Sequence, residues 1–179
     1  MAITIEPSRD PELLAQYFAL RERCYRRELN LPEFDGSGEL ADQLGLVLVA
    51  HEEGRCVGGA RIVPASLSAW GLPRLNTPLH QSCAWERFIL DPDTRSVDLA
   101  RDFCAGLIQH SYQLGYRQAL VLSSLRNARF YRRCHSALGV DFRIEHSIPD
   151  KRQSPFRGLE HYLSVSSFRS EPTIANLAA

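Results

Sequence analysis

The chain has 179 residues, of which 44% are hydrophobic and 23% are charged, so it is long enough to bury the core of one globular domain. Its formal net charge is +0, which provides no overall attraction to nucleic acid or to an anionic membrane. No apolar run approaches the ~20 residues of a membrane span, and Glu6, Arg9 and Asp10 interrupt the apolar stretch that a signal peptide requires.

Cysteine and histidine usage excludes several kinds of site. The five Cys are odd in number and form no C-x-x-C pair, so reduced thiols in the cytoplasm are the simplest interpretation. The six His are scattered, without the spacing of metal ligands, and no aromatic and basic platform for nucleic acid is evident. We therefore expect a cytoplasmic protein with no metal and no tightly bound cofactor; its oligomeric state does not follow from the sequence.

The first half of the chain has strong helix and turn signals. Asp10 is the expected N-cap of a helix with Pro11 at its first position, and Leu31-Pro32 is its expected end. Glu52 to Arg55 is the turn of a β-hairpin. The elements predicted here are, in order, a strand at 3–5, a helix from 11 to about 30, a Gly- and acid-rich loop at 33–42, and the hairpin strands at 44–50 and 56–63.

The second half alternates strands and helices. Ser96 or Thr94 caps the first helix and Gly115 closes it, and Ser123 or Ser124 caps the second. The predicted elements are a long connection at 66–82, a strand at 83–91, a helix at 97–114, a strand at 118–122, a helix from about 125 to 138, a strand at 140–148, a loop at 149–158 and a strand at 159–165. This order indicates one α/β (or α+β) domain over residues 1–168, with a mixed central sheet flanked by helices and a flexible tail at 169–179.

The strand at 83–91 runs directly into a helix, and the rest of the chain is organised around it. Unpaired N–H groups at a helix N-terminus commonly hold thioesters, phosphates or oxyanions. Glu86 and Arg87 lie on this strand in an otherwise apolar setting and point to opposite faces. They are either part of a site or structural, as a pair between Glu86 and Arg61 or as an outward salt bridge.

Several segments together resemble a known family. The matching segments are Leu20-Arg21 through Tyr25, the acidic loop with Glu39 and Asp42, Gly58-Gly59-Ala60-Arg61-Ile62-Val63-Pro64, and Glu86-Arg87-Phe88. They are similar to the acyl-homoserine-lactone synthases and the related N-acyl amino acid synthases, within the N-acetyltransferase (GNAT) superfamily. The resemblance implies a GNAT-like fold, an acyl thioester on bacterial acyl carrier protein as donor, a small amine as acceptor, and a carboxylate as general base.

Three positions depart from the family pattern. The family's pair of aromatic residues appears as Tyr25 and Leu31, so that the second aromatic is missing. Ala65 replaces the Thr that usually follows the Pro, and Glu86 is adjacent to Arg87 instead of three residues before the Arg. These departures argue against S-adenosylmethionine as the acceptor and against lactone formation.

The resemblance also assigns residues. Aminolysis of a thioester needs a base for the ammonium proton, and Glu86 is the candidate. The acceptor site implied by the family's polar cluster comprises Arg21, Tyr25, Glu39, Asp42, Arg61 and Arg87. A buried salt-bridge network that orders the loop is the structural alternative for the charged members.

The donor site is expected along the central strand and the loop after it. Gly58-Gly59 weakens a strand, so a close approach by an acyl chain or pantetheine arm is one explanation and a bulge is another. Tyr131 either protonates the leaving thiolate or belongs to a core stripe of its helix. The remaining expected donor contacts are Phe88, Thr94, Arg95 and Ser96.

A glycine cradle for a diphosphate is missing after the central strand. Residues 91–97 contain no Gly, and Asp91 and Asp93 would repel a diphosphate. This favours acyl carrier protein over coenzyme A as the carrier of the thioester. Arg126, Arg129 and Arg133 share one helix face, which would steer an acidic carrier protein or is simply solvated.

The sequence therefore predicts an N-acyltransferase that moves an acyl group from a thioester to a small amine. An acetyl-coenzyme A N-acetyltransferase is the alternative enzyme. A catalytically silent binding or regulatory member of the fold is the alternative from another class.

Overall fold

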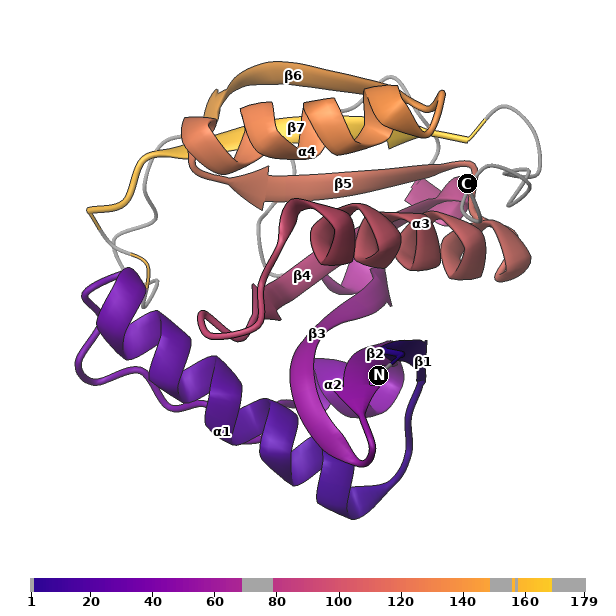
Figure 1. The fold of residues 1–179 in the computed structure, drawn as a ribbon. Coiled ribbons are helices and arrows are strands. Elements are labelled where there is room, and N and C mark those ends of the chain that lie inside the picture. The colour runs from indigo at the N-terminus through magenta and orange to yellow at the C-terminus, as the bar shows by residue number, and fades with distance from the viewer. Residues whose placement is uncertain (1, 69–78, 149–155, 157, 169–179) are drawn as a thin grey trace.

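A computed structural model describes residues 2–68, 79–148, 156 and 158–168 of the chain (Figure 1). The expected tail at 169–179 and most of the expected loop at 149–158 lie outside these residues. The elements are β1 (Thr4–Pro7), α1 (Pro11–Glu28), α2 (Leu40–Leu44), β2 (Leu46–Glu52), β3 (Arg55–Pro64), β4 (Ser82–Leu90), α3 (Val97–Gln113), β5 (Gln118–Ser123), α4 (Leu125–Ala137), β6 (Asp141–Ile148) and β7 (His161–Ser167), with short 3-10 turns at Ala65–Leu67 and Leu79–Gln81.

Within the described residues, seven strands form one mixed sheet in the order β1-β2-β3-β4-β5-β7-β6. Only β4 and β5 run parallel, and every other neighbouring pair is antiparallel. The crossover between β4 and β5 is made by α3, as a parallel connection requires. The expected mixed sheet flanked by helices, in a single domain, is confirmed.

Alternate side chains of β2 pack into two separate parts of the core, one on each face of the sheet. Leu48 packs in the cluster that includes Phe103 of α3, and Val47 packs in the cluster that includes Tyr17 of α1. Successive side chains of a strand point to opposite faces, so α1 covers one face while α3 and α4 cover the other (Figure 1).

The helices begin at the residues that the sequence indicates. The side chains of Asp10, Ser96 and Ser124 accept hydrogen bonds from the backbone N–H groups of Glu12, Leu99 and Asn127, which satisfies donors that have no partner within the helix. The N-cap of α3 is therefore Ser96 and not Thr94, and the N-cap of α4 is Ser124 and not Ser123. Gly115 follows α3 with a φ of 89°, a left-handed conformation that favours glycine.

Two boundaries differ from the prediction. Helix α1 ends at Glu28, before the expected end at Leu31-Pro32, and Asn30 has a left-handed φ of 53°. The expected loop at 33–42 runs into the short helix α2, whose capping box joins Glu39 and Asp42 reciprocally. Strand β2 consequently begins at Leu46 instead of residue 44.

Strand β4 contains a bulge opposite Ala60. Gly59 pairs with Ile89 and Arg61 pairs with Glu86, so β4 uses one residue more than β3 over this interval. Arg87 has a φ of 58°. Pairing between β4 and β5 extends only from Ser82 to Trp85 on β4, and the two strands diverge beyond it (Figure 1). The bulge therefore lies at the mouth of a gap in the sheet.

None of the helices within the described residues is both long enough and apolar enough to cross a membrane.

Candidate active site

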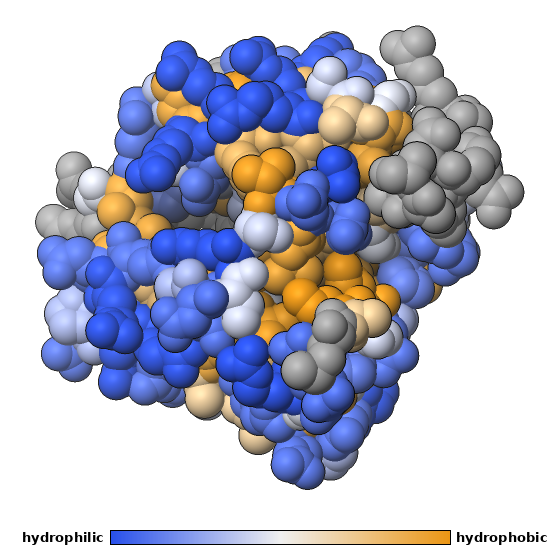
Figure 2. Space-filling model, in the orientation of Figure 1, coloured by the Kyte–Doolittle hydropathy of each residue, from blue (hydrophilic) through white to orange (hydrophobic). Residues whose placement is uncertain are grey.

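The diverging ends of β4 and β5 open into a cleft of about 1160 Å³. Its walls come from β4 (Trp85–Leu90), the end of β5 with the N-cap residue that follows it (121–124), the C-terminal part of α1, α2, and the N-terminal parts of α3 and α4. Figure 2 shows the surface hollowed between α1 and α4, with apolar residues bordering the hollow. Most of the lining is apolar, and its charged residues include Glu28, Glu39, Arg61, Glu86, Arg87, Arg95 and Glu160.

Arg61 is the hub of a charged network at this cleft. Its Nε donates to Glu86 Oε2 at 2.9 Å and its Nη1 contacts Glu39 Oε2 at 2.6 Å and Asp42 Oδ1 at 3.2 Å. The Arg61 side chain is 4% exposed. Burial acts to lower the pKa of Arg61, but Glu86, Glu39 and Asp42 outweigh it and raise the pKa above its usual value.

Two further arginines extend the network. Arg21 is fully buried and pairs with Asp42 at 3.2 Å, and it also donates to the carbonyl oxygens of Gly36 and Ser37. Arg87 pairs with Glu39 at 2.7 Å. Burial acts to raise the pKa of Glu39, but Arg87 and Arg61 lower it overall. Three arginines thus balance three carboxylates, which gives a compensated buried network.

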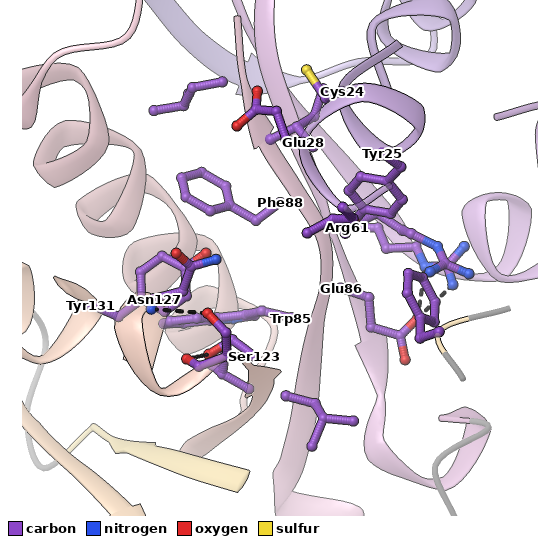
Figure 3. A pocket seen from close by; sticks show the side chains of 18 of the residues that line it. Cys24, Tyr25, Glu28, Arg61, Trp85, Glu86, Phe88, Ser123, Asn127 and Tyr131 are labelled. Atoms are coloured by element: carbon purple, nitrogen blue, oxygen red, sulfur yellow. Dashed lines mark hydrogen bonds and ion pairs between the residues drawn. The ribbon is translucent and has the colours of Figure 1, made fainter. Parts of the chain in front are cut away.

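Glu86 lines the cleft and is 8% exposed. Its Oε2 accepts two hydrogen bonds from Arg61, and its Oε1 accepts one from the Ser68 hydroxyl at 3.1 Å. The structural pair with Arg61, one of the two interpretations of the sequence, is therefore present. The carboxylate nevertheless reaches the cleft beside Arg61 (Figure 3), so the geometry combines both interpretations.

The acceptor residues expected from the resemblance are brought together. Tyr25, Glu39, Arg61 and Arg87 line the cleft, whereas Arg21 and Asp42 lie behind them in the network. Glu86 and Arg87 were expected to point to opposite faces, but both line this cleft, because the bulge interrupts the alternation of β4 at Arg87. Tyr25 has an aromatic partner that the sequence pattern did not indicate, because Phe34 lies 4.7 Å from it between ring centroids. Phe34 comes three residues after the expected position at Leu31, and the turn that follows α1 brings it back against the helix.

Tyr131 both packs and faces the cleft. Its ring lies 5.6 Å from Phe88 and 6.5 Å from Phe142 between centroids, and it also lines the cavity. Burial raises the pKa of Tyr131 well above the usual value for a phenol, so the hydroxyl is protonated at neutral pH. Phe88, an expected donor contact, also packs on Phe103 at 5.0 Å.

Gly58 and Gly59, two of the expected donor contacts, lie against other parts of the chain. A Cβ on Gly59 would lie 2.4 Å from Cδ2 of Tyr17, and one on Gly58 would lie 2.5 Å from Cδ2 of Leu90. The close approach therefore comes from the protein's own core, where α1 packs on β3. Both glycines are buried and neither lines the cleft.

Backbone N–H groups of the loop after β4 form hydrogen bonds within the loop itself. The N–H groups of Thr94 and Arg95 donate to the carbonyl oxygen of Asp91, and the Asp93 N–H donates to the Asp91 side chain. These groups are consequently not presented to a diphosphate. Arg95 and Ser96 line the cleft, whereas Thr94 does not. Arg95 is paired with Glu28 at 2.7 Å.

The α4 arginines stand outside the cleft. Arg126, Arg129 and Arg133 are exposed on the outer face of α4, and none of them lines the cavity. The face of α4 that does line it carries Asn127 and Phe130, which the sequence did not single out. An apolar helical period marks Phe130, but nothing local marks Asn127 or, on β7, His161.

Within the described residues, no cluster of three or more His, Cys, Asp or Glu side chains is arranged to hold a metal ion. All five cysteines are buried and carry free thiols.

Comparison with solved structures identifies the fold. The acyl-homoserine-lactone synthase LasI superposes with a TM-score of 0.70 at 15% sequence identity, covering 97% of this chain and 93% of that chain. The coenzyme A-dependent acyl-homoserine lactone synthase BjaI, solved with MTA, gives 0.67 at 19% identity, covering 95% and 84%. An acyl-CoA N-acyltransferase from Pseudomonas aeruginosa gives 0.61 at 13% identity, covering 92% and 99%.

The structural neighbours are thus acyl-homoserine lactone synthases and N-acetyltransferases, at low sequence identity. The chain has the GNAT-like fold expected from the sequence. No protein-family profile matches the sequence, and no curated protein matches it.

Proposed function

We propose that the protein is an N-acyltransferase that transfers an acyl group from a thioester to the amine of a small acceptor. The observation that carries the proposal is the cleft at the β4 bulge, which has a mostly apolar interior and, on part of its wall, the charged residues Arg61, Glu86 and Arg87. An apolar interior suits an acyl chain, and a charged wall suits a polar acceptor. The neighbours of the same fold, an acyl-homoserine-lactone synthase and an acyl-CoA N-acyltransferase among them, support acyl transfer.

Each step of the transfer has a candidate group. The acceptor nitrogen attacks the thioester carbonyl carbon, so a C–N bond forms and the C–S bond breaks. Glu86, directly or through a water, takes the proton from the acceptor nitrogen, and Tyr131 gives a proton to the leaving thiolate. Arg87 and Phe88 have no register partner on β3, so their backbone N–H groups are the proposed donors to the developing oxyanion.

Acyl carrier protein is the proposed donor carrier, with coenzyme A as the alternative. In the loop at 91–96, the N–H groups of Asp93, Thr94 and Arg95 donate to Asp91, so these three donors are not free to bind a diphosphate. One structural neighbour, BjaI, is a coenzyme A-dependent enzyme, so the two carriers must be compared directly.

The test is a steady-state comparison of carrier-protein and coenzyme A thioesters that carry the same acyl chain. We expect a higher kcat/KM with the carrier-protein thioester. Tight and saturable use of acetyl-coenzyme A alone would instead assign the protein as an ordinary N-acetyltransferase. If mass spectrometry of extracts from overproducing cells also shows no new acylated amine, the silent binding module becomes the better description.

A further inference from the structure

The guanidinium of Arg87 stands in a box of aromatic rings. Its Cζ lies 5.0 Å from the ring centroid of Phe156 and 5.5 Å from that of Phe34. Tyr25 forms the third wall, with its ring centroid 4.7 Å from Phe34 and 5.8 Å from Phe156. We call these three rings the aromatic box. Aromatic rings around a cation, with a carboxylate beside them, are the arrangement that binds quaternary onium ligands.

In this protein the cation inside the aromatic box is the Arg87 guanidinium, and several contacts fix its position. Nη2 of Arg87 is bonded to Glu39 at 2.7 Å. The Tyr17 hydroxyl donates to the Arg87 carbonyl oxygen at 3.0 Å, and the bulge holds Arg87 at a φ of 58°. Removing the guanidinium from the box would break its pair with Glu39 and separate a partly buried charge from its partner.

Arg87 also differs from the other two arginines of the network in its unused donors. All three side-chain nitrogens of Arg61 donate to carboxylates. Those of Arg21 donate to Asp42 and to two carbonyl oxygens. For Arg87, the described residues provide Glu39 and the Tyr25 hydroxyl as hydrogen-bond partners, and its buried Nε has no partner among them. Arg87 lines the cleft, and a guanidinium has five N–H donors in all.

We infer that Arg87 determines the charge selectivity of the acceptor site: it fills the aromatic box against an onium group, and its unused donors receive an anionic group that the acceptor carries beside its amine. This inference rests on the proposed acyl transfer. The charged network is already balanced between three arginines and three carboxylates, so a net cationic acceptor would add an unpaired charge. A zwitterionic acceptor adds none, because its anionic group lies at Arg87 and its ammonium lies toward the adjacent Glu86.

The first experiment offers two pools of acceptors to the full-length protein with one acyl thioester, and mass spectrometry measures the acylated products. One pool contains the common amino acids, and the other contains their carboxamides, which keep the amine and lose the carboxylate. We expect at least about a tenfold preference for the amino acids in the wild type, since a charge-assisted hydrogen bond is lost with the amides. A preference near one would overturn the inference while leaving the acyl transfer intact.

The variants test whether Arg87 is the cause. Arg87→Ala should bring the preference close to one, and methylguanidinium added to this variant should restore it by occupying the vacated box. Arg87→Lys keeps a cation in place and should retain most of the preference. Arg117→Ala is the matched control, because Arg117 lies 5.0 Å over the ring of Tyr112 outside the cleft, and its preference should equal that of the wild type. A preference that survives in Arg87→Ala contradicts the assignment.

A binding measurement separates this inference from the proposed reaction. Tetramethylammonium, titrated by calorimetry, should bind Arg87→Ala and not the wild type, because only the variant has an empty box beside Glu39. If neither pool is acylated while this difference in binding is observed, the acyl transfer is wrong and the self-filled box stands. Equal binding to both proteins, or to neither, overturns the box itself.

Discussion

Glu86 combines a structural and a proposed chemical role in one carboxylate. Its two oxygens accept hydrogen bonds from Arg61 and Ser68, and the residue borders the cleft. Arg61 keeps Glu39 and Asp42 as partners if the charge of Glu86 is lost. The cost of that loss to stability should therefore be smaller than for an isolated buried pair.

We predict that Glu86→Gln lowers turnover by at least about a hundredfold, because the amide cannot accept the proton and general-base contributions are about 10² to 10⁴. The free energy of unfolding should fall by only about 1–3 kcal/mol, which is the cost of one poorly satisfied buried donor. Both quantities are measured on one preparation, by steady-state kinetics and by urea titration. Ser68→Ala is the control, because it removes one contact of the carboxylate and keeps its charge. A destabilised variant with activity within a few-fold of wild type would remove Glu86 from the mechanism.

Tyr131 offers a proton at the other wall of the cleft. Its hydroxyl has no hydrogen-bond partner among the described residues, and burial raises the pKa of Tyr131. It therefore remains a donor throughout the neutral and mildly alkaline range.

We predict that Tyr131→Phe lowers turnover by about a hundredfold or more if the thiolate must be protonated as it leaves. Melting temperature should hardly change, because the ring contacts with Phe88 and Phe142 are kept. Tyr116→Phe, outside the cleft, is the matched control for losing a phenol. The loss should shrink with a thioester whose thiol is more acidic, since such a thiolate needs no proton. Equal losses with both donors would return Tyr131 to a packing role.

At the scale of elements, α4 presents two different faces. Asn127, Phe130 and Tyr131 line the cleft, and the exposed arginines Arg126, Arg129 and Arg133 stand on its outer side. Such a separation would let one helix attract an acidic carrier protein and also border the acyl site.

We predict that reversing two of these arginines, as in Arg126→Glu with Arg129→Glu, mainly lowers the association rate with acyl carrier protein and flattens its dependence on salt. Stopped-flow binding at several ionic strengths measures both effects, and turnover at saturating donor should barely change. Arg55→Glu with Arg117→Glu alters the net charge equally at exposed positions on other elements. If both pairs change the salt slope by the same amount, α4 is a solvated face.

At the scale of the whole molecule, His135 ties α4 to the sheet. Its ring lies 4.5 Å from Phe142 and 5.6 Å from Trp85 between centroids, and its Nδ1 is 2.8 Å from the Tyr131 carbonyl oxygen. Burial lowers the pKa of His135 from 6.5 to about 4, although the hydrogen bond to Tyr131 acts to raise it. The neutral ring with its proton on Nδ1 satisfies this geometry.

We predict that the folded state loses about 2 kcal/mol from this group between pH 7.5 and pH 5. Over that range the unfolded histidine takes up a proton that the folded one refuses, so the free energy of unfolding falls as the pH falls from 6.5 toward 4. Urea titrations at the two pH values measure the loss. In His135→Leu, the fall in the free energy of unfolding between the two pH values should be smaller by about this amount, whatever the absolute stability of the variant. Parallel pH profiles for wild type and variant would contradict the prediction.

Apart from the short helix α2, the sequence by itself determined the order of the elements, the hairpin and the helix starts. Asp10, Ser96 and Ser124 act on N–H groups two or three residues away, and alternation in β2 depends on adjacent residues. Such local interactions are present in any arrangement of the whole chain. The Arg61–Glu86 pair was also open to prediction, because both residues carry charge in apolar strands.

Only the tertiary structure decided what the glycines and aromatic rings do. Gly59 accommodates Tyr17, which is distant in sequence. Phe34 replaces the expected second aromatic because the turn after α1 brings it back against Tyr25. Tyr17 reaches the bulge at Arg87 across 70 residues of sequence. The cleft and the aromatic box exist because β4 leaves β5 at that bulge while α1 packs on β3, and long-range packing of this kind has no local signature in the chain.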